Sequence, residues 1–376
     1  MTATTQRTWN QYTEALDVAA AFPDAIKGKT ILVTGVNKLG IGFSTAEALA
    51  SQSPKLLILA GRNKAKLQEC IDALKPKYSE VDFRPLILDL GSQAAVRDAA
   101  NEFNSWTDVP ALHLQINNAG IMDIPERTLT PEGNEVQFAT NHLGHFLFTN
   151  LISDKLVKAA KSAPKGTVRV INVASRGVVY SPIRFSDLTH TKAADGLPKS
   201  ELPNYAAIQM LHPTDNAEQT PYIPFAAYGQ SKTANVLFSL GLTERLYEKH
   251  GILSLAIHPG GIITELGRNR DQEEMQKKFD EFRAKGFHLK TLEQGSSTTL
   301  TAALDPKLAV PVKNGGGKGE DHRKLANEFG DSWEGKGAYL SDCQIAGDVP
   351  LWVTSWDEAE QLWEVSEKLV GEKFSY

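Results

Sequence analysis

Cysteine is scarce in this chain of 376 residues, which contains only Cys70 and Cys343. The two residues lie far apart in the sequence and have none of the spacings typical of metal ligands. Two cysteines are also too few for the disulfide framework of a small secreted protein. We therefore expect reduced thiols and an intracellular, cytoplasmic protein.

Long hydrophobic runs are absent as well. The most apolar stretches, such as residues 56–60, have the length of a strand and fall far short of the roughly 20 residues that span a bilayer. Residues 1–28 are polar and lack the basic start and long apolar run of a signal peptide. The sequence therefore predicts no membrane span. It predicts an N-terminal extension over residues 1–28, with a short amphipathic helix within residues 9–22.

An excess of positive charge is the third feature that is missing. Lys and Arg number 40 against 45 Asp and Glu, which gives a formal net charge of −5. This balance argues against a nucleic-acid-binding protein, because phosphate binding favours a basic surface. Hydrophobic residues make up 41 % and charged residues 23 %, so the chain has the composition of an ordinary globular protein.

Short apolar runs alternate with helical patterns along the chain. Strands are predicted over residues 30–34, 55–60, 83–90, 112–117, 168–173 and 252–258. Helices are predicted over residues 41–51, 64–74, 93–103, 131–160 (interrupted at Gly144), 228–250 and 356–370. This alternation predicts an α/β fold, a three-layer doubly wound parallel sheet of Rossmann type.

We expect a single domain over residues 29–376, with loop insertions at about 181–225 and 306–335. Both segments are polar and have no sustained period, and a sheet scaffold tolerates such loops at little cost. The first insertion follows the end of a predicted strand, where open α/β sheets bind ligands. It is a candidate substrate lid, and a loop without function is the alternative.

A glycine-rich loop lies between the first predicted strand and the first predicted helix. It contains Gly35, Gly40 and Gly42, with Lys38 and Ile41 beside them. Glycine permits a tight turn and a close approach of the backbone to a pyrophosphate, and the helix that follows offers N–H groups to an anion. Glycine is common in loops, but the position of this loop in a βαβ unit favours a dinucleotide site.

The end of the second predicted strand carries basic rather than acidic side chains. Arg62 follows Gly61, and no Asp or Glu stands at this strand end. An acidic residue here would bind a free ribose 2′-hydroxyl, whereas an arginine pairs with a 2′-phosphate. Arg62 and Lys38 therefore favour NADP(H) over NAD(H), and solvated surface charges are the alternative.

Tyr228 and Lys232 stand four positions apart in a predicted helix, so both lie on one face. A free tyrosine has a pKa of about 10, and a neighbouring ammonium is expected to lower that pKa towards the range of acid–base catalysis. Ser175 follows the predicted strand over residues 168–173. Its hydroxyl can donate to a carbonyl oxygen that becomes negative during hydride addition. A serine that closes a turn is the alternative for Ser175.

With several further motifs in a fixed order, these residues resemble the short-chain dehydrogenase/reductase family, and within it the retinol-dehydrogenase-like and fungal biosynthetic members. The resemblance covers about residues 27–306 and a strand over residues 337–340. The motifs are the glycine loop of residues 34–42, Leu88-Asp89-Leu90, Asn117-Asn118-Ala119-Gly120, Asn141-His142-Leu143-Gly144, Asn172-Val173-Ala174-Ser175, Tyr228-Gly229-Gln230-Ser231-Lys232 and His258-Pro259-Gly260-Gly261-Ile262-Ile263-Thr264. The sequence departs from the family pattern by placing four residues between Gly35 and Gly40, and by Ala174, where a serine is common.

The resemblance implies a role for each of these residues. It implies a catalytic set in which Asn141 bends its helix and holds a water in a proton relay to Lys232. Lys232 is also implied to bind the nicotinamide ribose. The cofactor contacts that the resemblance implies beyond the glycine loop are Asp89 with Leu90 for the adenine, Asn118 with Ala119 for a ribose, and Ile262 with Thr264 for the nicotinamide amide and phosphate.

The sequence thus predicts an NADPH-dependent carbonyl reductase or alcohol dehydrogenase. Tyr228 is expected to protonate the carbonyl oxygen of an apolar ketone or aldehyde of moderate size, and Ser175 to polarise it. The resemblance alone points to specialised-metabolite biosynthesis. A cofactor-binding regulator without turnover is one alternative. A membrane-attached lipid or retinoid dehydrogenase is another, although no anchor is visible.

The predicted partner is the small-molecule carbonyl or alcohol substrate. The sequence leaves the oligomeric state open, a homo-oligomer included. His142, His145 and His258 lie near the candidate chemistry, and no Cys or Glu-x-x-His pattern completes a metal site around them. They are expected to be ordinary family positions.

Overall fold

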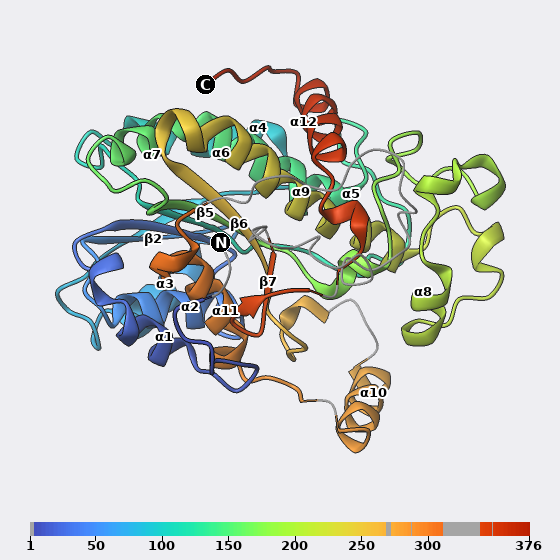
Figure 1. Ribbon diagram of the computed structural model, residues 1–376, viewed down its shortest axis with the longest axis horizontal. Coiled ribbons are helices and arrows are strands. Elements are labelled where there is room, and N and C mark those ends of the chain that lie inside the picture. Colours follow the sequence, from blue (N-terminus) through green and yellow to red (C-terminus); the bar gives the residue numbers. More distant parts are fainter. Residues whose placement is uncertain (1–3, 268–271, 287, 311–338, 348) are drawn as a thin grey trace.

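The computed structural model describes residues 4–267, 272–286, 288–310, 339–347 and 349–376 (Figure 1). Its strands are β1 (Thr30–Thr34), β2 (Leu56–Gly61), β3 (Asp82–Ile87), β4 (Leu114–Asn117), β5 (Val168–Val173), β6 (Ile252–His258), β7 (Tyr339–Ser341) and β8 (Gln344–Ile345). Its α-helices are α1 (Ala15–Ala21), α2 (Ile41–Ala50), α3 (Lys64–Leu74), α4 (Gln93–Ser105), α5 (Val136–Phe138), α6 (Gly144–Leu151), α7 (Ser153–Ala160), α8 (Tyr205–Leu211), α9 (Pro224–His250), α10 (Gln272–Ala284), α11 (Leu292–Leu304) and α12 (Trp356–Val370).

All described strands belong to one sheet, in the order β3-β2-β1-β4-β5-β6-β7-β8. Neighbours from β3 to β7 pair in parallel, and β8 pairs antiparallel with β7 at the edge. The chain starts at β1, winds outward to β3 and returns to β4 on the other side of β1. This arrangement confirms the predicted doubly wound sheet, and it places the switch point between β1 and β4.

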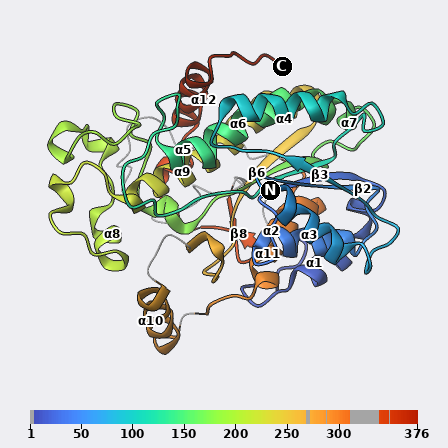
Figure 2. The same ribbon diagram turned by 180° about the vertical axis from the view of Figure 1, so that it is seen from behind.

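Helices cover both faces of the sheet, which gives the three predicted layers (Figures 1 and 2). One face carries α1, α2, α3 and α11, and the other carries α4, α6, α7, α9 and α12. Successive side chains of β1 alternate between the two cores, since Ile31 and Val33 pack on one face and Leu32 on the other. Burial on both faces explains why the central strands read as continuous apolar runs.

The short helix predicted within residues 9–22 is present as α1, in the second half of that range. The described helix α1 begins at Ala15, because the residues before it form a turn of their own. Thr13 N donates to the carbonyl of Asn10, and the Asn10 side chain accepts from Tyr12 N at 2.9 Å. Such local side-chain bonds compete with a helix.

Gly144 does not interrupt its helix as predicted. A π-helical turn, Ala139–Leu143, precedes it, α6 begins at Gly144, and the chain bends at Ile152. A Cβ at position 144 would lie 2.4 Å from the carbonyl oxygen of Leu90, so the glycine permits close packing against the segment that follows β3.

The insertion of residues 181–225 forms a lobe at one side of the molecule, with α8 in it and short 3₁₀ turns around it (Figure 1). The predicted insertion of residues 306–335 lies mostly outside the described residues. Of the predicted strand over residues 337–340, the described part belongs to β7.

Candidate active site

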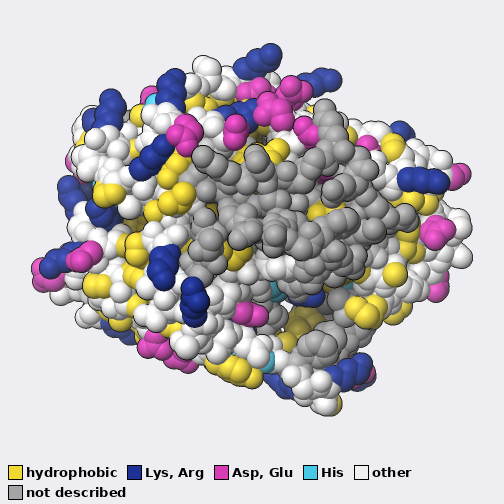
Figure 3. Space-filling model, viewed as in Figure 1, with side chains coloured by type: hydrophobic (Ala, Val, Ile, Leu, Met, Phe, Trp, Pro, Cys, Tyr) yellow, Lys and Arg dark blue, Asp and Glu magenta, His cyan; other side chains and the backbone are white. Residues whose placement is uncertain are grey.

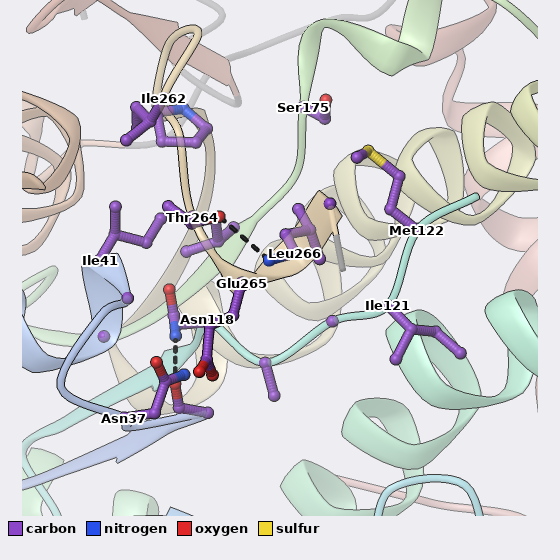
Figure 4. A pocket seen from close by; sticks show the side chains of 18 of the residues that line it. Asn37, Ile41, Asn118, Ile121, Met122, Ser175, Ile262, Thr264, Glu265 and Leu266 are labelled. Carbon is purple, nitrogen blue, oxygen red and sulfur yellow. Dashed lines mark hydrogen bonds between the residues drawn. The ribbon is translucent and has the colours of Figure 1, made fainter. Parts of the chain in front are cut away.

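The carboxyl ends of β1, β2, β4, β5 and β6 border a pocket of about 710 Å³. Figure 3 shows the surface hollowed beside α10. In the close view, Asn37 and Ile41 lie at one end, Ser175 and Met122 lie at the other, and the loop after β6 runs between them (Figure 4). The volume falls within the range of about 300–1,000 Å³ typical of small-molecule sites, at the sheet edge where doubly wound folds bind ligands.

The glycine loop forms one end of this pocket through Gly35, Gly40 and Gly42. Gly35 has φ +72°, and a Cβ there would lie 2.6 Å from the Cα of Ala119. A Cβ at Gly42 would lie 2.7 Å from the carbonyl oxygen of Gly35. Gly40 is the N-cap of α2, and within the described ranges no side chain caps this helix. A close-packed loop that ends in an uncapped helix start fits the pyrophosphate of a dinucleotide.

Thr34 fixes the loop after β4 against the glycine loop. Its Oγ1 accepts hydrogen bonds from the backbone N–H groups of Asn118 and Ala119, each at 3.0 Å. The Asn118 side chain donates in return to the carbonyl of Thr34 at 2.8 Å. Asn118 and Ala119 thereby line the pocket beside the glycine loop, where the resemblance places a ribose.

Tyr228, Ser175 and Lys232 meet at the other end of the pocket. Tyr228 and Lys232 come from the first half of α9, and their side chains are buried. Ser175 lies just after β5; its hydroxyl is hydrogen-bonded to Tyr228 and accepts from Gly177 N at 3.0 Å. A Cβ at Gly177 would lie 2.9 Å from the Tyr228 ring, so this glycine leaves room for the phenol.

Burial governs the ionisation of Tyr228 and Lys232. It raises the pKa of Tyr228 to about 12, although the hydrogen bond with Ser175 acts in the opposite direction. It lowers the pKa of Lys232 to about 7. The Lys232 Nζ donates to the carbonyl of Val173 at 2.9 Å and lies 5.7 Å from the centre of the Tyr228 ring. The pKa of Tyr228 is thus shifted opposite to the lowering expected from Lys232, because desolvation by burial is the largest cause of the shift.

Asn141 is fully buried in the π-helical turn and does not line the pocket itself. Its side chain donates to the carbonyl of Ile121 at 2.9 Å and accepts from the N–H of the same residue at 2.8 Å. It also donates to Ser231 Oγ at 2.9 Å, between Tyr228 and Lys232 on α9. Asn141 therefore joins three segments of the site, and its role in a proton relay stays a prediction.

The end of β2 presents basic side chains to the pocket, as the sequence suggests. Arg62 lines the pocket and is exposed. Lys66, one turn into α3, lines it too and forms an ion pair with Glu265 at 3.3 Å. Sequence reasoning missed this pair, because its members lie on different elements and nearly 200 positions apart along the chain.

The remaining predicted cofactor contacts fall into two groups. Ile41, Leu90, Ile262 and Thr264 line the pocket, and Thr264 Oγ1 accepts from Leu266 N at 3.2 Å (Figure 4). Lys38 and Asp89 are not among the described lining residues. Lys38 is exposed and lies near enough to Cys70 for its charge to oppose the raised pKa of that thiol. Asp89 accepts from Gly91 N at 3.0 Å.

Several residues beside Tyr228 line the pocket and were not predicted. The insertion contributes His212, whose ring stacks on Phe225 at the start of α9 with an angle of 3° between the ring planes. Tyr180 meets both rings edge-on. Met122 and Met275 line the pocket as well. The position of the insertion after a strand end was the one signal in the sequence that could have pointed to His212.

Neither a metal site nor a membrane helix emerges from the described ranges. They hold no group of three or more His, Cys, Asp or Glu side chains that is arranged for a metal ion. They also hold no helix with the length and apolar character that a bilayer crossing requires.

Comparisons with known proteins agree with this geometry. The family model for short-chain dehydrogenases matches residues 29–195. Oxidoreductase fscI of Fusarium equiseti is 38 % identical over 249 residues, which cover 66 % of this chain and 93 % of that protein. Retinol dehydrogenase 12 of Mus musculus is 31 % identical over 353 residues, which cover 92 % and 87 %. The crystal structure of an uncharacterized protein from Mycobacterium paratuberculosis superposes with a TM-score of 0.59 at 25 % identity, and covers 95 % of this chain and 98 % of that one.

Proposed function

The chain belongs to the short-chain dehydrogenase/reductase family of oxidoreductases, and from that premise we propose that it is an NADPH-dependent carbonyl reductase. The proposed reaction transfers a hydride between the nicotinamide and the carbonyl or alcohol carbon of an apolar substrate of moderate size. The family explains the nicotinamide cofactor. The preference for NADPH, the substrate and the reacting residues are parts of the proposal.

One observation carries the proposal. A single pocket joins the glycine loop and Arg62 at one end to Ser175, Tyr228 and Lys232 at the other. Its volume of about 710 Å³ is large enough for an extended dinucleotide to bind across it from one end to the other. A site that only stored a dinucleotide would have no need of a buried phenol hydrogen-bonded to a serine at its far end.

The protein groups suit the reduction of a carbonyl. NADPH supplies a hydride to the carbonyl carbon when it is bound. The raised pKa keeps the proton on the Tyr228 phenol at neutral pH, so this group can donate it to the oxygen that becomes negative. The hydroxyl of Ser175, which is hydrogen-bonded to this phenol, can turn its single proton to the same oxygen once a substrate is bound. The Tyr228 side chain is buried, which limits the access of water to the proton transfer.

The preference for NADPH is supported by Arg62 and Lys66. Both are basic, both line the pocket at the end of β2, and an arginine fits a phosphate through paired hydrogen bonds. The carboxylate of Glu265 lies beside Lys66 and reduces the net positive charge there. We therefore assign the larger part of the recognition of a 2′-phosphate to Arg62.

The apolar substrate is supported by the residues around Tyr228. Met122, Tyr180 and Phe225 pack with Tyr228 and line the pocket there, and Met275 and Phe279 of α10 line the same pocket. The name of the related retinol dehydrogenase 12 fits an apolar alcohol or aldehyde. A role in specialised-metabolite biosynthesis stays a prediction from the resemblance.

The proposal is tested by following NADPH oxidation with a panel of apolar ketones and aldehydes, for the wild type and Tyr228→Phe. We expect the substitution to lower kcat at least about 100-fold, because it removes the proton donor and little of the packing. Tyr247→Phe, at a buried tyrosine that is not among the described lining residues, is the matched control and should keep most of the activity.

NADPH binding is measured on the same proteins by fluorescence titration. Turnover that survives in Tyr228→Phe would contradict the assignment of the acid. Tight NADPH binding without turnover by the wild type on the whole panel would favour the regulator.

A further inference from the structure

His145 lies inside the protein between the end of β1 and the turn that carries Asn141. Its side chain is 1 % exposed. The ring Nδ1 lies 3.1 Å from the carbonyl oxygen of Asn141, and the ring Nε2 lies 2.9 Å from Oγ1 of Thr34. The imidazole therefore bridges the residue that anchors the cofactor cradle and the residue implied in the proton relay.

The directions of these hydrogen bonds follow from their partners. Thr34 Oγ1 already accepts the N–H groups of Asn118 and Ala119, so its own proton is left to donate. The nearer acceptor is His145 Nε2 at 2.9 Å, against 3.5 Å for the carbonyl of Ile116. Nε2 is then unprotonated, and the proton of a neutral ring sits on Nδ1.

The other end of the ring gives the same tautomer independently. The Asn141 carbonyl can only accept, so Nδ1 must carry the proton that it shares with this oxygen. The two ends agree on a neutral imidazole with Nδ1–H. Burial, together with the charge of Lys232, lowers the pKa of His145 to about 4 and keeps the ring neutral at working pH.

The Asn141 carbonyl belongs to a turn whose backbone bonds are displaced. Gly144 N bonds the carbonyl of Ala139, five residues back, as in a π-helix. In this turn the Asn141 carbonyl has the His145 ring as a side-chain partner, in contact through Nδ1. The same turn lies close to Lys232, because a Cβ at Gly120 would lie 3.1 Å from Asn141 Oδ1 and 3.4 Å from Lys232 Nζ.

We propose that His145 is a positioning residue, whose Nδ1–H holds the backbone carbonyl of Asn141 in the orientation that proton delivery to Tyr228 requires. Its Nε2 accepts from Thr34 and so connects this carbonyl to the loop that holds the cofactor. This inference rests on the proposed reductase function. It adds that the proton-relay side and the cofactor side of the pocket are held as one unit by a buried histidine.

Two substitutions separate the two bonds of the ring. Asn at position 145 reaches as far as Nδ1, so His145→Asn keeps a donor for the Asn141 carbonyl and loses the contact with Thr34. Gln reaches as far as Nε2, so His145→Gln keeps an acceptor for Thr34 and loses the bond to Asn141. Both remove the ring, so both lose comparable packing, and a merely structural role would affect their kcat alike.

The experiment measures kcat, KM, the solvent deuterium isotope effect on kcat and the NADPH Kd for the wild type and both variants. We expect His145→Gln to lower kcat about tenfold and to raise the isotope effect, because proton delivery becomes slower. Its NADPH Kd should stay within about twofold of the wild type. His145→Asn should keep kcat within about twofold.

Equal kcat values and equal isotope effects in the two variants would overturn the inference, whether both match the wild type or both fall together. Absence of Tyr228-dependent turnover in the wild type is a different result, since it would reject the proposed function itself. If one variant fails to fold, ¹⁵N-histidine NMR of the wild type decides, with the other variant used to assign the signal. A His145 ring that is charged, or protonated on Nε2, between pH 6 and 8 would overturn the inference.

Discussion

Glu135 shows how burial sets the charge of single residues in this protein. Its side chain is 1 % exposed and caps α5 by accepting the Phe138 N–H at 2.8 Å. Burial raises the pKa of this carboxyl to about 7, although the backbone hydrogen bonds of Phe138 and Gln137 oppose the shift. The unfolded chain releases this proton at its ordinary pKa of 4.5, and the folded protein releases it only near pH 7. The folded state therefore loses stability as the pH rises from about 4.5 to 7.

We expect Glu135→Gln to remove this pH dependence, because a glutamine oxygen can still accept the Phe138 N–H and carries no charge. Between pH 5 and pH 8 the wild type should lose up to about 3 kcal/mol of unfolding free energy relative to the variant. Urea denaturation at both pH values measures the difference. Glu126→Gln, at an exposed position, should behave as the wild type. The same pH dependence in Glu135→Gln would show that the carboxyl ionises freely in the folded protein.

At the scale of elements, a buried ion pair organises the lobe of residues 181–225. Arg184 and Asp187 pair with each other, and both side chains are nearly inaccessible to solvent. Asp187 also accepts from Thr191 N at 2.9 Å and from Lys192 N at 2.9 Å, and Arg184 donates to the carbonyl of Lys192 at 2.7 Å. The pair therefore stabilises the turn at residues 184–192, at the start of the lobe that brings His212 to the pocket.

Asp187→Asn should loosen this lobe and leave the rest of the fold in place. The change leaves the Arg184 charge buried without a counter-ion, which typically costs about 3–5 kcal/mol. We expect faster hydrogen exchange across residues 181–225 and a KM for the carbonyl substrate about tenfold higher. The NADPH Kd should hardly change, because the glycine loop lies outside the lobe. Asp195→Asn is the matched control at an exposed position of the same lobe. A rise of KM in both variants, or in neither, would contradict this role for the pair.

The elements that the sequence predicts well are those whose burial leaves a periodic or continuous apolar pattern. The strand over residues 168–173 and the helix over residues 64–74 have the bounds of β5 and α3. Helix α11 was missed, because it is rich in Thr and Ser and is buried around most of its circumference. The capping box of Thr291 and Gln294 was the signal that could have revealed it.

At the scale of the whole molecule, the pocket depends on contacts that no local pattern encodes. Family motifs placed Tyr228 and Ser175 because each motif ends a predicted strand or begins a predicted helix. Met275 and His212 reach the same pocket from segments that the motifs do not cover, and only the packing of α10 and of the lobe brings them there. The sequence predicted Lys38 as a cofactor contact, but the side chain is exposed and is not among the described lining residues. Its position depends on the path of the longer glycine loop, which the motif does not define.

Because the proposed cofactor site joins the ends of five strands, NADPH should stabilise the molecule as a whole. A ligand at about 100 times its Kd adds about 2.7 kcal/mol to the free energy of unfolding, which raises Tm by about 3 °C in a chain of this size. We expect a clearly smaller shift with NADH at the same concentration, because Arg62 then has no 2′-phosphate to pair with. In Arg62→Ala the two shifts should become similar, whereas Lys64→Ala, an exposed neighbour that does not line the pocket, should keep the difference. Equal shifts for NADPH and NADH in the wild type would mean that the basic end of the pocket does not select the phosphate. Thermal melts of the three proteins with each cofactor therefore test the cofactor preference without any knowledge of the substrate.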